Sequence, residues 1–203
     1  MKTQLDTELA LIQHADILEL TQAVLPAAPE CFWTMPASTS GKYHPAHSLG
    51  QGGLIRHTRA VVLFTVHLLE MQGTPATHRE FSIAIAAAIL HDCCKKTDTE
   101  THTAFDHPAR AAQLILSTAQ RIWPYAFTDG HRPLTPTENL VTPIPGAHTA
   151  RAIAAAVHSH MGRWNVNDRT GQTLPTPLTP LQRLIHTADY LASRKNIALP
   201  DIS

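Results

Sequence analysis

The spacing of hydrophobic residues predicts a chain made almost entirely of helices. Apolar positions recur at intervals of three and four residues in several stretches, which is typical of amphipathic helices. No stretch of useful length alternates between apolar and polar residues as a half-buried strand does. We therefore expect an all-α bundle of roughly six to eight helices, with at most an isolated short strand. The predicted helices cover residues 5–25, 53–72, 78–93, 107–121, 147–160 and 180–195.

Capping and turn residues mark some of these boundaries. Asp6 and Thr7 are candidate caps for the first helix. Thr77, followed three residues later by Glu80, predicts a capping box before the third helix. Pro108 suits the first turn of the helix that follows. The segments between helices are predicted to be irregular: a loop over 26–52, a proline-rich excursion over 124–147 and a second irregular stretch over 162–180.

Length, charge and cysteine content narrow the class of protein. The 203 residues are 43% hydrophobic and show no linker or repeat, so we expect one domain over 1–203, with an N-terminal helix in 1–29 and the core in 30–195. The zero formal net charge disfavours binding to long nucleic acids. Three cysteines are not a disulfide framework. With no signal peptide and no apolar run long enough to span a membrane, we expect a cytoplasmic protein without a membrane partner.

Histidine is over-represented, at 14 residues, and two of these histidines fall on faces that should be buried. His57 precedes the apolar stripe of its helix, and His91 ends an apolar helix, directly before Asp92. Asp189 lies four residues after Ile185, again on an apolar face. Burying unpaired carboxylates is costly, so this set predicts a divalent cation between the helices. Imidazole and carboxylate ligands suit Mn, Fe, Co, Ni, Zn or Mg.

The order of these residues resembles that of the HD-domain superfamily of metal-dependent phosphohydrolases. The pattern is a His, then a His-Asp pair, then a distant Asp, here His57, His91-Asp92 and Asp189. The resemblance runs from about residue 32 to residue 194 and implies an HD-like helical bundle in which 30–195 is the catalytic core.

A closer resemblance lies in CFWTMPASTSGKYHPAHSLGQGGLIRHT, residues 31–58. It is similar to the stretch before the first ligand in bacterial 3′-to-5′ exoribonucleases that join an OB-fold to an HD domain. This chain has no room for the OB-fold, so exonuclease action on single-stranded RNA or DNA is kept as the alternative function. A basic groove built from Lys42, Arg56, Arg59 and Arg163 would favour it.

The resemblance also implies ligands for a second metal ion. His107-Pro108 is similar to the His-Pro that opens the next helix in two-metal members. HSHMG, residues 158–162, resembles a Ser-His-His-Gly segment, which places His160 at the first histidine and Met161 at the second. We therefore expect one tightly bound ion and a weaker second one, bridged by Asp92. His158 is the alternative ligand in this segment.

Substrate-binding residues follow from neighbouring positions. Lys95 fits the His-Asp-x-x-Lys form of the motif, where its ammonium would hold a phosphate oxygen; a solvated cation at a helix end is the alternative. Trp164 would stack on a base or anchor its loop, and His186 would support a ligand. The remaining candidates for lining the site are His44, His47, Arg163 and Arg194.

We therefore predict a metal-dependent phosphohydrolase with Asp92 and Lys95 in catalytic roles. Its expected substrate is a nucleotide, a short oligonucleotide or a related small phosphorylated compound, cleaved at a phosphoester or phosphoanhydride bond. A non-catalytic nucleotide-sensing module is the third alternative. The oligomeric state is left open.

Overall fold

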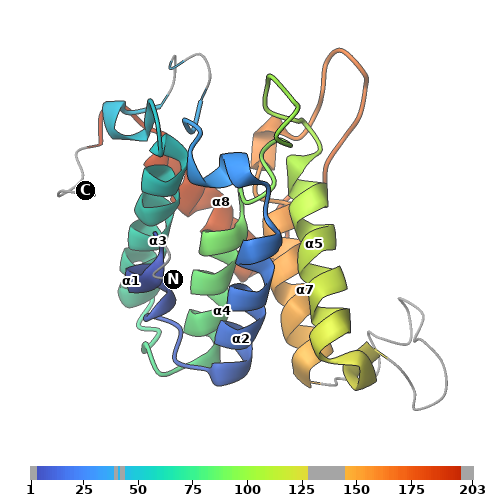
Figure 1. The fold of residues 1–203 in the computed structure, drawn as a ribbon. Helices are drawn as coiled ribbons and strands as arrows, with labels where there is room; N and C mark the ends of the chain where they lie inside the picture. Colours follow the sequence, from blue (N-terminus) through green and yellow to red (C-terminus); the bar gives the residue numbers. More distant parts are fainter. Residues whose placement is uncertain (1–3, 39–40, 42–43, 128–144, 198–203) are drawn as a thin grey trace.

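The computed structural model describes residues 4–38, 41, 44–127 and 145–197 (Figure 1). Regular secondary structure in this part of the chain is helical, apart from one isolated bridge between Val166 and Thr173. The prediction of an all-α fold is thus confirmed. The α-helices are α1 (Asp6–Leu9), α2 (Ala15–Val24), α3 (Gly53–Met71), α4 (Arg79–Leu90), α5 (His107–Ile122), α7 (Pro145–His158) and α8 (Pro180–Ala192).

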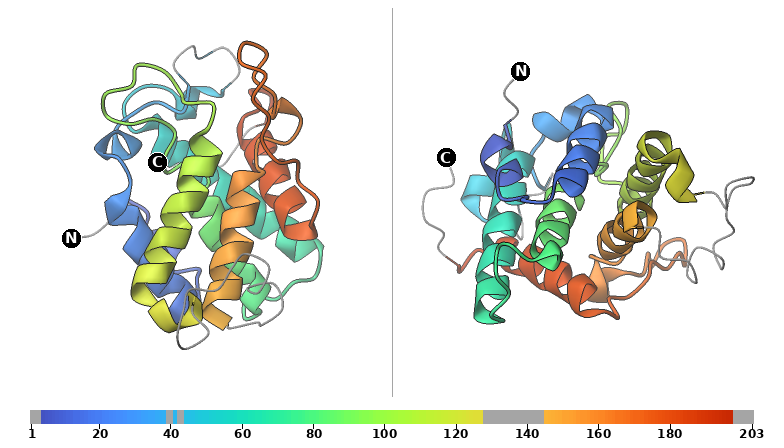
Figure 2. Two further views of the ribbon diagram at one scale, coloured as in Figure 1. Left: turned by 90° about the vertical axis from the view of Figure 1, so that its right-hand side faces the viewer. Right: turned by 90° about the horizontal axis from the view of Figure 1, so that it is seen from below.

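Helix α4 is the centre of the bundle. It packs against α2, α3, α7 and α8, and every residue from Ala84 to Leu90 is fully buried. Helices α3, α4, α5 and α7 run alternately down and up in Figure 1, while α8 crosses the bundle behind α3 and α4 (Figures 1 and 2). The start of α3, the end of α4, the start of α5 and the end of α7 therefore meet at one end of the molecule.

The first predicted helix, 5–25, is wrong as a single element. The chain forms α1 and α2 with a break between them, although Leu5 and Ile12 are buried as the pattern required. The Oγ atom of Ser82 in α4 accepts a hydrogen bond from the backbone N–H of Gln13 at 3.2 Å and lies 3.0 Å from Nδ1 of His14. This hydroxyl from another helix replaces a backbone partner, so the break leaves Gln13 hydrogen-bonded. Leu5, not Asp6 or Thr7, is the N-cap residue of α1.

Three other helix ends differ from the prediction. Helix α4 begins after His78, which makes no side-chain capping bond, so the capping box at Thr77 and Glu80 is not formed. It also ends at Leu90, so that His91 and Asp92 lie in the following turn. Helix α7 ends at His158, before His160. The capping box that does form is at the start of α8, between Thr179 and Gln182.

Where they are described, the segments predicted to be irregular contain short 3₁₀ turns, apart from the Val166–Thr173 bridge and the start of α7. These are η1 (Leu25–Ala27), η2 (Glu30–Trp33), η3 (Ala46–Ser48), η4 (Pro124–Phe127) and η5 (Gly162–Trp164). Most of the predicted excursion over 124–147 lies outside the described residues. None of the described helices combines the length and hydrophobicity needed to cross a lipid bilayer.

Candidate metal centre

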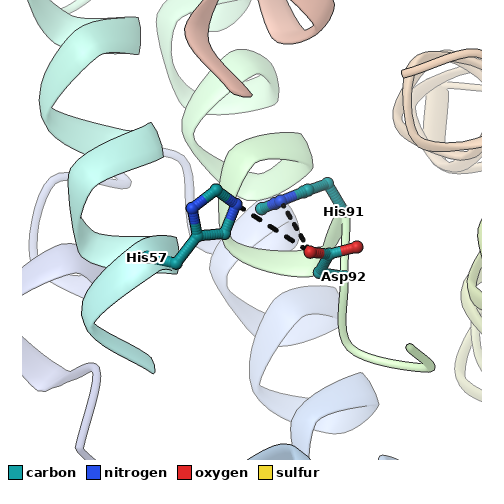
Figure 3. A group of neighbouring side chains, drawn as sticks. All are labelled: His57, His91 and Asp92. Atoms are coloured by element: carbon teal, nitrogen blue, oxygen red, sulfur yellow. Dashed lines mark ion pairs between the residues drawn. The ribbon is translucent and has the colours of Figure 1, made fainter. Parts of the chain in front are cut away.

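Asp92 lies between two groups of histidines at the end of the bundle where the four helices meet. Its side chain is 2% exposed, and the residue lies in the turn that follows α4 (Figure 3). Oδ2 faces Nε2 of His57 at 3.9 Å and Nε2 of His91 at 3.4 Å. Oδ1 faces Nε2 of His107 at 3.0 Å and Nε2 of His160 at 3.7 Å. The carboxylate thus offers one oxygen to each group.

Three of these histidines are oriented in the same way. Nδ1 of His91, His107 and His160 lies 2.7 Å from the backbone carbonyl three residues earlier, that of Ala88, Ala104 and Val157 respectively. A carbonyl oxygen only accepts, so each Nδ1 carries the proton. In its neutral form each ring therefore presents the lone pair of Nε2 to the centre, which is the arrangement that metal-ligating histidines adopt.

The first group of ligand atoms is spaced like a coordination shell. Nε2 of His57 lies 3.0 Å from Oδ1 of Asp189, and Nε2 of His91 lies 3.9 Å from the same oxygen. Atoms held about 2.1 Å from one ion lie roughly 3 to 4 Å from one another. Despite this proximity, neither Nε2 atom has a hydrogen-bond partner among the described residues. These buried, unpaired atoms fit a bound cation.

The second group shows a conflict that a cation resolves. Nε2 of His107 and Nε2 of His160 lie 3.4 Å apart, and both rings use Nδ1 to bond a carbonyl. In the neutral rings two lone pairs and Oδ1 of Asp92 face the same point. A single proton satisfies only two of these three acceptors, whereas a metal ion satisfies all three. His57, His91 and Asp92 form one group of suitable geometry, and Asp92, His107 and His160 form another.

The surroundings adjust the protonation of these ligands. Burial opposes ionisation of Asp92, but the charges of Lys95 and His91 outweigh it and hold the pKa of its carboxyl well below its usual range. Burial lowers the pKa of His57, and burial together with the charge of His91 lowers the pKa of His160 to about 3. Burial also opposes protonation of His91, but the charge of Asp92 prevails and raises the pKa of its imidazole.

The raised pKa of His91 predicts that metal binding releases a proton. A metal ion needs the unprotonated Nε2, so affinity at the group of His57, His91 and Asp92 is expected to fall as pH decreases through the raised pKa of His91. Binding of an ion there should therefore release protons, in a number that rises as the pH falls through the raised pKa of His91. Calorimetric titration in two buffers with different ionisation enthalpies measures the proton count; zero protons released would contradict the prediction.

A cavity of about 570 Å³ opens beside the centre. Asp189, with 21% of its side chain exposed, stands at the edge between the buried ligands and this cavity. His57 and His91 are fully buried and do not line it. The predicted residues that do line it are His44, Asp92, Lys95, His107, His160, Arg163, Trp164, Asp189 and Arg194.

Two further predicted residues lie before α3. The ring of His44 packs 5.4 Å from that of His57, and burial lowers the pKa of His44 to about 4. His47 is not among the residues that line the cavity. Its carbonyl accepts a hydrogen bond from Arg56, which ties this loop to α3. The loop lies so close that a Cβ on Gly53 would meet the carbonyl oxygen of Ser48 at 2.2 Å, which explains a glycine at the start of α3.

The basic groove expected for nucleic acid is not assembled by the described residues. Arg56 donates to the carbonyls of His47, Leu49 and Gln51, and Arg59 contacts Gln4 and Glu8, so both guanidinium groups hold the fold together. Lys42 lies outside the described residues. Of the three proposed groove residues that the structure describes, Arg163 lines the cavity and Arg56 and Arg59 do not.

Aromatic and cationic side chains form one wall of the cavity. Trp164 stacks on Tyr190 with ring centroids 5.6 Å apart, and the guanidinium of Arg163 lies 4.5 Å from the Trp164 ring. Arg194 covers Tyr190 at 4.3 Å. The Trp164 ring therefore already has two partners, which favours the role of an anchor over that of a free stacking platform. The sequence does not single out Tyr190, because nothing but its position after Asp189 distinguishes it.

His186 supports the second group of ligands from α8. Its Nδ1 donates to the carbonyl of His160 at 2.8 Å. Its ring occupies the space beside Gly162, where a Cβ would meet ring atoms at 2.1 to 2.4 Å. His158 is only partly buried and is not among the cavity-lining residues. The structure thus places His160, and not His158, at the centre.

Comparison with known proteins agrees with this geometry. A family model described as HD domain matches residues 54–194, a span that contains both groups of candidate ligands. Searches of curated proteins and of solved structures gave no match. HD domains form a superfamily of metal-dependent phosphohydrolases. The chain therefore belongs to the HD-domain family.

Proposed function

We propose that this protein is a metal-dependent phosphohydrolase that cleaves a phosphoester or phosphoanhydride bond of a nucleotide or a related small phosphorylated substrate. The observation that carries the proposal is the set of histidines whose Nδ1 atoms are bonded to carbonyls and whose Nε2 atoms converge on Asp92. A structural histidine cluster gains nothing from lone pairs that face one another, whereas a hydrolytic metal centre requires them.

The ligands would be divided between two ions. His57, His91, Asp92 and Asp189 would hold the first, and Asp92, His107 and His160 the second. Suitable metals are Mn, Fe, Co, Ni, Zn and Mg. A divalent cation supplies Lewis acidity and lowers the pKa of a water that it holds. Asp92 fixes the relative position of the two sites because each of its oxygens faces one of them.

The cavity accounts for the proposed substrate. Its volume of about 570 Å³ suits a ligand the size of a nucleotide. Lys95, Arg163 and Arg194 bring positive charge to its wall, where they would attract and orient an anionic phosphate group. Exonuclease action remains the alternative that the resemblance of residues 31–58 predicts. Among the described residues, however, Arg56 and Arg59 are engaged in contacts within the fold and do not line a groove. A long nucleic acid or a membrane is not an expected partner.

Hydrolysis of small phosphorylated compounds should depend on a bound divalent ion. Elemental analysis of the purified protein is expected to find one to two ions per chain, because there are two groups of candidate ligands. Removing them with a chelator should lower the rate at least about 100-fold, because the centre would lose its Lewis acid. The substrate panel would contain nucleoside mono-, di- and triphosphates, cyclic nucleotides and short oligonucleotides, with product formation followed by chromatography.

Each outcome of this panel separates the candidate functions. Metal-dependent turnover of nucleotides supports the proposal, and restoring the ion to chelated protein should restore the rate. Stepwise shortening of oligonucleotides without turnover of nucleotides would establish the exonuclease alternative. Nucleotide binding by a protein that takes up no ion would identify a sensing module.

A further inference from the structure

The ammonium group of Lys95 contacts Oδ2 of Asp92, the carboxylate oxygen that the first metal ion would also use. Nζ of Lys95 lies 2.5 Å from Oδ2 of Asp92. The same oxygen faces Nε2 of His57 and Nε2 of His91. The lysine side chain is 11% exposed and the aspartate side chain 2%, so this ion pair is largely shielded from water. In this arrangement, Lys95 supplies the positive charge that the buried carboxylate needs.

A divalent ion and the ammonium group repel each other if both stay on Oδ2. Two cations on one carboxylate oxygen lie within a few ångströms of each other, and shielding from water strengthens their repulsion. The ion has three further ligands in His57, His91 and Asp189, whereas Lys95 is held at the centre through its contact with Asp92. The lysine is therefore the group that should leave.

The Lys95 side chain can move into the cavity when it leaves Asp92. It lines the cavity, and its four-carbon stem allows the ammonium group to rotate away from Asp92 without movement of the backbone. There it would join Arg163 and Arg194 at the wall that faces an entering anion. A phosphate oxygen is the kind of partner that an ammonium group displaced from a carboxylate would take.

We propose that Lys95 and the metal ion compete for Oδ2 of Asp92, so that metal binding releases Lys95 into the cavity as a binding group for phosphate. Lys95 thus neutralises Asp92 in the metal-free protein and binds substrate in the loaded one. The inference rests on the proposed function in one respect, namely that His57, His91 and Asp92 hold a divalent ion. It goes further by making the phosphate-binding site depend on the ion.

The first test compares metal affinities. Lys95→Met removes the competing charge and keeps most of the aliphatic stem, so metal-free protein should bind Mn²⁺ about tenfold more tightly or better at its tight site. Lys95→Arg keeps the charge and should stay much closer to the original affinity. Lys96→Met is the matched control, because the Lys96 ammonium bonds the carbonyl of Glu100 and not Asp92. Affinities would be measured from free Mn²⁺ by electron paramagnetic resonance.

A second test uses the unaltered protein and so does not depend on the folding of a variant. Lysines are acetylated with an N-hydroxysuccinimide ester, with and without Mn²⁺, and the extent at each site is read by mass spectrometry. Lys95 should be acetylated faster once Mn²⁺ is bound, while Lys96 reports any general change in reactivity. Saturating inorganic phosphate should then protect Lys95 in the metal-loaded protein.

The outcomes distinguish this inference from the proposed function. Unchanged or weaker Mn²⁺ binding by Lys95→Met, or no gain in Lys95 acetylation with Mn²⁺, would overturn the competition while leaving the metal centre in place. Failure of the unaltered protein and all three variants to bind Mn²⁺, Co²⁺ or Zn²⁺ would overturn the metal centre itself, and the inference with it.

Discussion

Replacing Asp92 with alanine is expected to abolish binding of both metal ions and to lower hydrolysis at least about 10³-fold. The reason is the division of its carboxylate, which offers Oδ2 to His57 and His91 and Oδ1 to His107 and His160. Removing any single histidine should leave the other group intact. His57→Ala and His160→Ala are therefore each expected to lose one ion and keep one.

Metal counts by elemental analysis, taken beside hydrolysis rates, check this difference. Asp92→Asn tests whether the loss follows from the charge, since the amide keeps the shape of the side chain. Asp168→Asn is a suitable control because Asp168 is an exposed acidic residue away from the cavity. If Asp92→Ala retained an ion at full occupancy, the carboxylate would not be the bridge between the two groups.

Replacing Gly162 with alanine is expected to cause a large loss of stability. Gly162 has φ of +56°, where a side chain costs about 1 to 2 kcal/mol. Its Cβ would also meet the His186 ring at 2.1 Å, and relieving such overpacking costs about 1 to 3 kcal/mol more. We expect the free energy of unfolding to fall by about 3 kcal/mol, and metal affinity at His107 and His160 to fall with it.

Gly171→Ala separates the backbone cost of a positive φ from the cost of the clash with His186. Gly171 has φ of +72° but no atom within 4 Å of its would-be Cβ among the described residues, so only the backbone cost applies. Denaturant unfolding should show a loss of about 1 to 2 kcal/mol for this control. Adding His186→Ala to Gly162→Ala should recover part of the stability because it removes the clashing ring. Equal losses of unfolding free energy for Gly162→Ala and Gly171→Ala would show that the His186 ring moves aside without a measurable loss of stability.

Much of the bundle is predictable from the sequence because its helices carry their own periodic signal. Helices α3 and α5 lie close to their predicted limits, and the apolar helix before His91 is indeed deeply buried as α4. The break between α1 and α2 is not predictable, because it depends on a hydroxyl from Ser82, far away in the sequence. Local patterns do not contain partners of that kind.

The candidate ligands are predictable for a different reason, namely their position at helix ends and in a known order. His91 follows α4 and His107 begins α5, so the direction of each helix brings them to one end of the bundle. His160 lies in a turn where the sequence predicts helix, although the residue itself is buried as expected. The contact of Lys95 with Asp92 and the ring of Tyr190 depend on side-chain packing that spacing does not encode.

The packing of α8 against α3 affects the order in which parts of the site form while the chain is being synthesised. His57, His91, Asp92, His107 and His160 all precede α8 in the chain, whereas Asp189, Tyr190 and Arg194 come from α8 or from just after it. A nascent chain therefore contains all the histidines of both groups, together with Arg163 and Trp164, before α8 adds Asp189 to the first group and completes the cavity wall with Tyr190 and Arg194. Since α8 reaches α3 only across a long stretch of sequence, its docking is a late, non-local step. The histidines could therefore bind a metal ion before that step, but the proposed hydrolysis would have to wait for it.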